Sequence, residues 1–460
     1  LALVLALGWI EVLLPIVSRW VGQNFAFDVF NSLECWSMVL IIFVCGTFFI
    51  GLYPSFLLTH IKPSDIMRGK FLHSRKGNKI RKILIVIQFV ASFILVSGTI
   101  VVIRQIHFMQ QETSSAMFDR VLVLKYPALT ENMSVQMMNF KKRLEQESFI
   151  SHVAVSGAVP GVEVANYFTN RPYGSDISEI KLIQMFAVDY DYLTLYSPKI
   201  ICGRIFSENY GNELNKVVLN EEAARLLGYS SPEDALGKQL AMEVLEEPLE
   251  IIGVVKNYHQ QSLAEPYKPI MFFIKERVPF IATPYISIQL NTEINAKQVA
   301  KIEQIYKTYF PSAVFSYFRL SDYNDDLYKS DRNFSWIFTC ASLLAIFVAC
   351  LGLWIMTLFS TMARVKEIGI RKVLGADKKS LFWVLTRELV LLTILATVLG
   401  TPLSIILMDE WLRTYAFHII LPWWGYVIAF VLMIFVALLT VAHQVWRVIR
   451  LKPMRILRNE

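Results

Sequence analysis

The chain has 460 residues, of which 55% are hydrophobic and only 18% are charged, and its mean hydropathy is positive. This composition excludes an ordinary soluble domain of this size and indicates a membrane protein. The formal net charge is +7. The excess of basic residues lies beside apolar segments, which is typical of positive-inside retention and not of a nucleic-acid partner.

Six apolar runs approach or exceed the roughly 20 residues that a helix needs to cross a bilayer. Five of them carry no charge, and the sixth, at 1–18, contains Glu11. The five uncharged runs are 37–58, 83–103, 335–363, 389–408 and 417–442. The run at 1–18 has no basic leader and no small-residue cleavage site. We therefore interpret it as a truncated transmembrane helix and not as a signal peptide.

The basic residues predict the orientation. Segment 60–82 carries eight Lys and Arg against one acid, segment 361–388 carries seven against three, and the tail 443–460 carries five against Glu460. The positive-inside rule places these segments in the cytoplasm and residues 104–332 outside. We expect a polytopic α-helical membrane protein with six spans and a large extracytoplasmic domain.

Residues 104–332 lose the long apolar runs and predict an α+β domain, in one piece or in two subdomains. Strands are expected at 121–125, 152–156, 217–219, 250–256 and 286–290, and helices at 134–147, 221–227 and 296–309. Segments 104–112 and 320–334 contain no Gly or Pro and adjoin spans. We expect them to extend the spans as stalk helices, with ordinary linkers as the alternative.

The chain repeats itself at an offset of 390 residues. Phe25-Ala26-Phe27, an apolar run and Ile61–Arg68 (IKPSDIMR) match Tyr415-Ala416-Phe417, an apolar run and Leu451–Arg458 (LKPMRILR). We therefore interpret residues 1–58 as the last two spans of a first copy of the C-terminal unit. A basic linker at 59–82 would join them to the span at 83–103.

The sequence contains no recognisable motif for nucleotide binding, metal binding or hydrolysis. A phosphate-binding loop is absent, because Pro232 stands where its first glycine belongs before Gly237-Lys238. Any ATP would therefore be hydrolysed by another chain. The seven histidines show no ligand spacing, and no Gly-x-Ser-x-Gly elbow occurs. We predict no metal or cofactor on this chain and no enzymatic activity, and we interpret His259 as a structural histidine.

Residues 364–376 (RVKEIGIRKVLGA) resemble the cytoplasmic signature of the FtsX-like permease domain. Further agreement comes from Glu388, the span break Gly400-Thr401-Pro402, Tyr415–His418 and Lys452–Arg458. The outer domain is similar to the MacB-type periplasmic core in Val217–Ala224, Pro232–Lys238, Ile251–Val255 and Leu263–Pro269. Asn257-Tyr258-His259 stands where that domain is expected to have Asp-Phe-His, a conservative departure.

The resemblance implies the C-terminal part of a doubled bacterial ABC permease of the MacB/FtsX kind in the cytoplasmic (inner) membrane. Residues 333–460 would be its C-terminal permease domain with three spans, and residues 104–332 its periplasmic core. The expected partner is a cytoplasmic ABC ATPase, a dimer that binds ATP and Mg. A second permease copy or a periplasmic adaptor and membrane lipids are further expected partners. The ATPase-coupling residues would be Lys366, Glu367, Ile368, Gly369, Ile370, Arg371, Lys372, Leu374, Gly375 and Ala376.

The coupling segment has the chemistry of a docking element. Glu367 and Arg371 stand at i and i+4 and can pair on a short helix, Ile368 and Leu374 offer apolar contacts, and Gly375 can end the helix. The alternative is a positive-inside loop that lies on anionic headgroups.

Two functions remain open. The first is an ABC permease that transmits ATP-driven motion to its outer domain and exports or extracts a peptide, a drug or a lipid-like substrate. The second is an FtsX-like regulator that activates an envelope hydrolase or another partner and transports nothing. Both would share the coupling segment, so the sequence does not separate them, and it names neither a substrate nor a substrate-binding residue.

Overall fold

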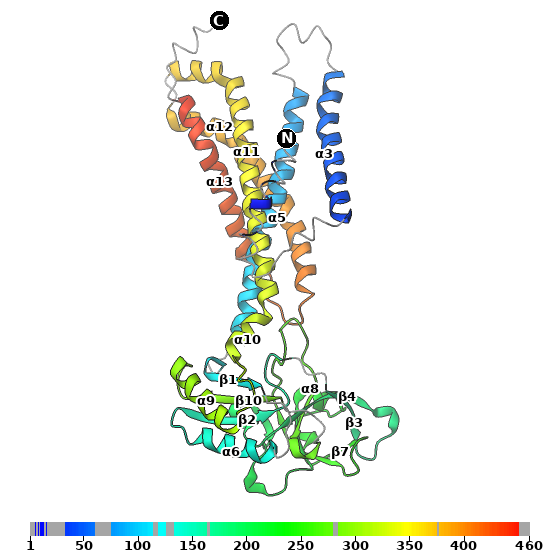
Figure 1. The fold of residues 1–460 in the computed structure, drawn as a ribbon. Coiled ribbons are helices and arrows are strands. Elements are labelled where there is room, and N and C mark those ends of the chain that lie inside the picture. The colour runs from blue at the N-terminus through cyan, green and yellow to red at the C-terminus, as the bar shows by residue number, and fades with distance from the viewer. Residues whose placement is uncertain are drawn as a thin grey trace. The chain divides into compact units, whose positions relative to one another are not determined.

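The computed structural model describes residues 33–59, 75–113, 118–125, 133–162, 166–278, 284–374 and 377–449, with residues 5, 8, 10–12 and 15. It forms two compact units, which are shown in Figure 1. The membrane unit comprises 1–97, 336–404 and 424–460, and the core unit comprises 98–335 and 405–423.

The long helices are α3 (Leu33–Thr59), α5 (Arg75–Thr113), α11 (Lys329–Val373), α12 (Lys378–Leu412) and α13 (Trp423–Ile449). Within the described residues, four stretches are long and apolar enough to cross a membrane: Arg81–Gln111, Lys329–Leu358, Thr386–Leu412 and Trp423–Ala442. They coincide with four of the six predicted spans. The span expected at 37–58 falls in α3, whose described apolar stretch Trp36–Phe48 is shorter. Most of the span expected at 1–18 lies outside the described residues, as do most of the repeat landmarks.

Small and polar side chains bring the helices of the membrane unit together. Ser342 Oγ donates to the Leu95 carbonyl at 2.9 Å, and the hydroxyls of Ser97 and Ser404 lie 2.8 Å apart. A Cβ on Gly352 would stand 2.7 Å from Gln88 Oε1. Such contacts are typical of helix packing in lipid, where small residues permit close approach. The polar residues Gln88 and Ser97 thus serve helix packing.

The prediction of a span break at Gly400-Thr401-Pro402 is wrong. Helix α12 continues through Pro402 to Leu412. Proline removes one backbone donor, but a helix within a bundle tolerates this loss where neighbouring groups compensate. Thr401 Oγ1 donates to the Thr397 carbonyl at 2.8 Å in the same turn.

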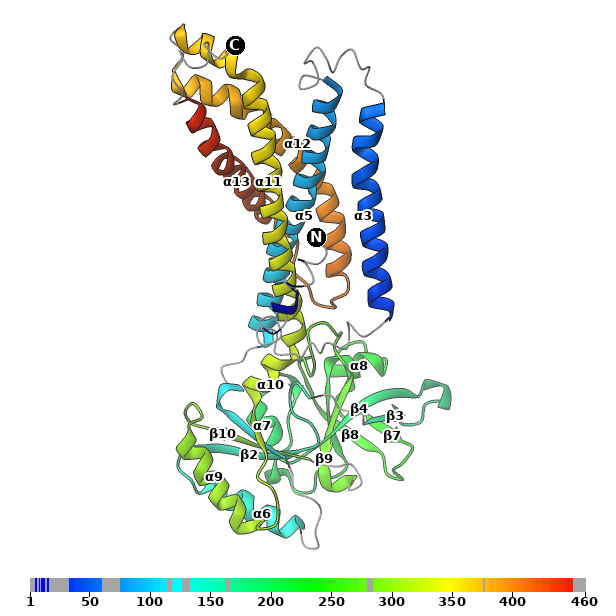
Figure 2. The ribbon, with the colours of Figure 1, turned by 45° about the horizontal axis from the view of Figure 1, so that its top comes forward.

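The core unit contains the α+β domain and consists of two halves (Figures 1 and 2). The first half is an antiparallel sheet in the order β11-β1-β10-β2. These strands are Tyr317–Arg319, Val121–Lys125, Tyr285–Leu290 and Ile150–Ser156. Helices α6 (Met133–Glu145) and α9 (Ala296–Tyr309) cover one face of the sheet, where Phe140, Ile302 and Tyr306 are buried against it.

The second half is a ring of six strands. β4, β3, β7, β8, β6 and β9 pair in that order, and β9 pairs with β4 in parallel to close the ring. The strands are Lys181–Val188, Tyr167–Pro172, Gln239–Met242, Leu249–Val255, Lys216–Asn220 and Ile270–Ile274. β5 (Ile200–Gly203) pairs with β8 outside the ring. Met185, Ile251 and Phe273 belong to the buried cluster of this half.

The shorter elements complete the core unit. They are the helices α7 (Tyr192–Tyr196), α8 (Glu221–Leu226) and α10 (Leu320–Leu327), and the 3-10 turns Phe118–Arg120, Ile177–Glu179, Glu208–Tyr210, Glu233–Ala235 and Lys275–Arg277. A second apolar cluster, which includes Val123, Phe186 and Phe272, draws on strands of both halves. In the ladders, the halves meet at one pair, Ser156 on β2 opposite Val188 on β4.

The predicted elements of this domain are largely confirmed. β1 and α9 have the expected bounds, and the other predicted strands and helices agree within a few residues. α5 continues to Thr113, as the first stalk prediction requires. The second stalk does not run straight into its span, because Tyr328 interrupts the helix between α10 and α11. The Tyr328 side chain is buried in a cluster with Val102 and Met109.

Candidate functional site

The predicted coupling segment is the end of a long helix. α11 runs without interruption to Val373, so the backbones of Lys366, Glu367, Ile368, Gly369, Ile370, Arg371 and Lys372 are helical. Instead of the short separate helix that was expected, the segment is the last part of a 45-residue helix. Leu374 follows in a turn with 80% of its side chain exposed, and the Arg371 side chain is exposed. Gly375 and Ala376 lie outside the described residues, as do the side chains of 359–370.

The loop between α12 and α13 belongs to the core unit and packs against another loop of that unit. Ala416 N donates to the Ala264 carbonyl at 3.0 Å, and Phe417 N donates to the Leu263 carbonyl at 3.2 Å. Leu263 and Ala264 belong to the loop between β8 and β9. Two backbone hydrogen bonds therefore join two loops that are about 150 residues apart in the sequence.

An aromatic cluster surrounds this contact. The Phe417 ring lies edge-on to His259 with centroids 4.6 Å apart, and its centroid is 4.7 Å from that of Tyr267. The rings of His259 and Tyr267 are 4.5 Å apart. Aromatic pairs at such distances each contribute about 0.5–1.5 kcal/mol beyond their burial. His259 is thus a packing residue, in agreement with its structural interpretation.

Gln105 on α5 binds the same loop with both ends of its side-chain amide. Nε2 donates to the Phe417 carbonyl at 3.0 Å, and Oε1 accepts from Ile419 N at 2.9 Å. Its side chain is completely buried. Loss of such a residue would leave two partly buried backbone groups without this partner, at about 1 kcal/mol for each, the lower end of the cost for a buried group.

Asp331 in the first turn of α11 and Tyr328 just before that helix supply the third attachment. Tyr415 Oη donates to Asp331 Oδ1 at 2.8 Å, and Leu263 N donates to Tyr328 Oη at 3.3 Å. Burial, together with the neighbouring Asp331 carboxylate, raises the pKa of Tyr415, so the phenol stays protonated and remains a donor. The α12–α13 loop is therefore bonded to α5, to α11 and to the β8–β9 loop.

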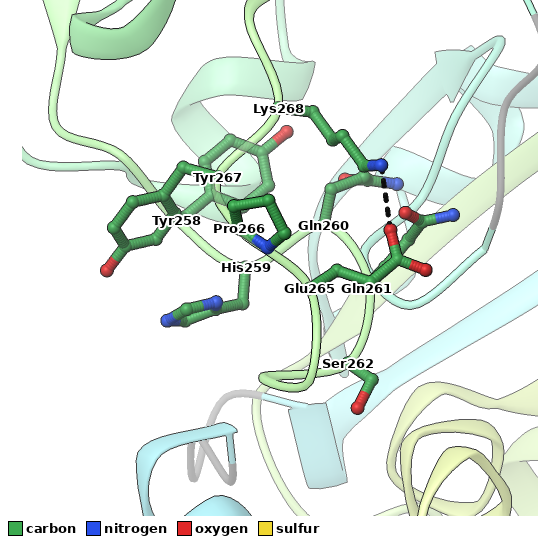
Figure 3. A pocket seen from close by; sticks show the side chains of 9 residues that line it. All are labelled: Tyr258, His259, Gln260, Gln261, Ser262, Glu265, Pro266, Tyr267 and Lys268. Carbon is green, nitrogen blue, oxygen red and sulfur yellow. Dashed lines mark ion pairs between the residues drawn. The ribbon is translucent and has the colours of Figure 1, made fainter. Parts of the chain in front are cut away.

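The β8–β9 loop also holds a small pocket (Figure 3). Nine residues line it: Tyr258, His259, Gln260, Gln261, Ser262, Glu265, Pro266, Tyr267 and Lys268. Lys268 Nζ and Glu265 Oε2 form an ion pair at 2.8 Å on its wall. The empty space is about 190 Å³, open solvent included. Pockets for small molecules usually enclose roughly 300–1,000 Å³, so this hollow is part of the loop packing and is no substrate site of that size.

Sequence reasoning missed the residues of this junction. The sequence shows Gln105 and Asp331 only as parts of predicted stalk helices, and Phe417 only within motifs of the repeat and of the family resemblance. One signal was present, since Leu263–Pro269 and Tyr415–His418 both belong to the family resemblance. Among the described residues, no three His, Cys, Asp or Glu side chains gather in a way that could hold a metal ion.

Two family models match the chain. The FtsX-like permease C-terminal model matches residues 339–453, and the MacB-like periplasmic core domain model matches residues 86–305. The chain therefore contains an FtsX-like permease C-terminal domain and a MacB-like periplasmic core domain. The predicted coupling segment thus lies within the FtsX-like match, and the β8–β9 loop lies within the MacB-like match.

Relatives with curated descriptions agree with this assignment. The chain is 24% identical over 237 residues to the uncharacterized ABC transporter permease YvrN of Bacillus subtilis, covering 49% of this chain and 57% of that protein. It is 21% identical over 268 residues to the macrolide export ATP-binding/permease protein MacB of Aggregatibacter actinomycetemcomitans, covering 57% of this chain and 39% of that protein. The chain thus spans about half the length of the curated relatives it matches.

Solved structures align with part of this chain. The periplasmic region of MacB from Actinobacillus actinomycetemcomitans is 14% identical and aligns over 46% of this chain and 93% of its own, with a TM-score of 0.33. The extracellular domain of the transporter YknZ from Gram-positive bacteria is 16% identical and aligns over 43% and 97%, with a TM-score of 0.30.

Proposed function

We propose that this chain is the permease subunit of an ABC transporter. A separate cytoplasmic ATPase hydrolyses ATP, and the permease converts that reaction into movement of its extracytoplasmic core. The movement exports or extracts a peptide, a drug or a lipid-like substrate. The two matched domains support the proposal, together with relatives described as ABC permeases and as a macrolide exporter.

The observation that carries the proposal is the continuity of α11. Its 45 residues form an uninterrupted helix of roughly 65 Å, at about 1.5 Å per residue. One end holds Asp331, which accepts the hydrogen bond from Tyr415, and the other end is the predicted coupling segment. A helix transmits an axial displacement along its whole length, so a push at the cytoplasmic end reaches the core unit.

The cytoplasmic end has the properties of a protein docking site. Leu374 exposes 80% of its side chain, and the exposed Arg371 stands three residues before it. An apolar side chain beside a guanidinium suits a groove with an acidic rim. The helical backbone at 366–372 places Glu367 and Arg371 one turn apart, so they can stabilise the helix as an i,i+4 pair.

The test combines co-purification with ATP hydrolysis. The full-length protein is purified in lipid nanodiscs with its candidate ATPase subunit, as wild type and as Glu367→Ala/Arg371→Ala. The matched control is Glu303→Ala/Lys307→Ala, an exposed i,i+4 pair on α9. We expect the coupling variant to lose the ATPase or its stimulation, and the control to behave as wild type. A coupling variant that retains both, or a wild type that binds no ATPase, would refute the proposal.

An FtsX-like regulator is the alternative, and it differs in what the moving core does. If a candidate substrate stimulates ATP hydrolysis and is itself moved by the complex, the result supports transport. Activation of an envelope hydrolase by the same ATPase-bound complex, without any substrate effect, supports regulation.

A further inference from the structure

The α12–α13 loop leaves few backbone donors to solvent. Arg413, Thr414 and Tyr415 donate to carbonyls at the end of α12, and Ala416 and Phe417 donate to the β8–β9 loop. Gln105 accepts the next bond, from Ile419 N. A loop whose donors are met by protein acceptors has one preferred conformation. It can therefore transmit a displacement instead of absorbing it.

The β8–β9 loop is anchored to the ring half. Asn257 N donates to Glu221 Oε2 at 2.8 Å, and Glu222 N donates to Asn257 Oδ1 at 2.9 Å, so the start of the loop is fixed to the first turn of α8. Its two ends continue into β8 and β9, which are neighbours of β6 in the ring.

The same loop is also bound to residues 159–162, which directly follow β2 of the first half. Gln260 Nε2 donates to the Val159 carbonyl at 2.7 Å and to the Val162 carbonyl at 3.0 Å. Gly161 N returns a bond to the Gln260 carbonyl at 2.8 Å. Gln260 is 3% exposed, so water does not compete for these bonds. The β8–β9 loop therefore bridges both halves of the core unit.

The boundary between the halves is suited to movement. Their ladder pairing is limited to Ser156 and Val188. Hydrogen bonds between 155–157 and 187–189 and the ion pairs of Lys141 with the segment after β4 reinforce this edge of the boundary. The remaining contact is largely the apolar cluster around Phe186 and Phe272, whose contacts are not directional, so the halves can pivot about the bonded edge while this cluster slides by small amounts. A force applied to the β8–β9 loop would therefore act across this boundary and change the angle between the halves.

We propose that residues 415–419 and 257–268 form a clasp through which the membrane helices change the angle between the two halves of the core. Gln105 and Phe417 are its positioning residues. Gln105 ties the clasp to α5, and Phe417 fills the space between His259 and Tyr267. The inference rests on the proposed function, because ATP-driven helix movement supplies the displacement. In this scheme the stalk helices move the whole core unit, and the clasp changes the angle between the two halves of that unit.

The test measures the angle between the halves by distance. Spin labels are placed on Val135→Cys in α6 and Ile177→Cys beside β4, both exposed, in a background with the five native cysteines replaced. Distances are recorded by double electron–electron resonance in nanodiscs with the ATPase bound, without nucleotide and after trapping with ATP and vanadate. The variants are Phe417→Ala and Gln105→Leu, and the control is Ile420→Ala in the same loop, with 93% of its side chain exposed.

We expect the distance to shift on trapping in the wild type and in the control. Phe417→Ala and Gln105→Leu should lose the shift while they still bind the ATPase and hydrolyse ATP. Gln105→Glu keeps the acceptor for Ile419 N and loses the donor to the Phe417 carbonyl. It is the milder substitute if Gln105→Leu or Phe417→Ala fails to fold, and it should also reduce the distance shift.

The outcomes separate the two ideas. A wild type without bound ATPase overturns the proposed function and the clasp with it. A bound, active ATPase with no distance shift in the wild type, or with the same shift in the clasp variants, overturns the clasp alone.

Discussion

Lys141 holds the two halves of the core unit together, and Lys141→Met tests the strength of this connection. Lys141 on α6 contacts Asp189 at 2.7 Å and Asp191 at 2.5 Å, just after β4. Asp189 also accepts hydrogen bonds from the backbone amides of Val155 and Tyr192. Removal of one partner from a buried ion pair costs about 3–5 kcal/mol. Because Asp189 keeps two donors, we expect the lower end, about 3 kcal/mol.

Amide hydrogen exchange can measure this loss of stability. Intrinsic tryptophan fluorescence is unsuitable, since residues 104–332 contain no tryptophan. A loss of about 3 kcal/mol lowers protection of β4 and α6 amides by roughly 100-fold. Lys307→Met, whose side chain is 62% exposed, is the matched control and should change protection less than about 3-fold. Lys141→Met/Asp189→Asn should recover part of the loss, because the lone buried charge is gone. Unchanged protection in Lys141→Met would refute the reasoning.

Two further predictions concern glycines. Gly203→Ala should destabilise the core by about 2–5 kcal/mol, because φ is +72° and the new Cβ would overlap the Ile252 carbonyl. Gly211→Ala, with φ +80° and open space, should cost about 1–2 kcal/mol, and equal losses in denaturant titrations would contradict the overlap argument. Gly352→Leu should lower the melting temperature in detergent, because its Cβ would stand 2.7 Å from Gln88 Oε1 on α5. Gly46→Leu on α3 meets nothing within 4 Å, and a matching decrease there would show that helix packing is not the cause.

The sequence predicted strands with clear alternation or β-branched runs and missed both short, partly exposed strands, such as β5 and β11, and the fully buried β9. Val121–Lys125 was recognised from its β-branched run, and α9 from its 3.6-residue spacing. β9 (IMFFI) is buried at all five positions and shows no alternation. A short apolar run of this kind does not distinguish a strand from a buried helix. Its parallel pairing with β4, which closes the ring, depends on residues more than 80 positions away.

The clasp was beyond sequence reasoning for a similar cause. Gln105, Leu263, Asp331 and Phe417 come from four distant segments, and no spacing rule connects them. Gln105 looks like any polar residue near the end of an apolar run. Its importance comes from complete burial and from two backbone partners, which only the folded chain supplies.

The ring half is one continuous stretch of chain, from β3 to β9, inserted between β2 and β10 of the other half. During synthesis all six ring strands are complete before β10 exists, whereas β1 waits for a partner that lies more than 160 residues downstream. Contacts between segments close in sequence form faster than contacts between distant ones. The ring should therefore fold first and serve as a template for the antiparallel sheet of the first half. A ribosome paused after residue 278 would then carry a protease-resistant ring beside an unprotected β1–β2 segment.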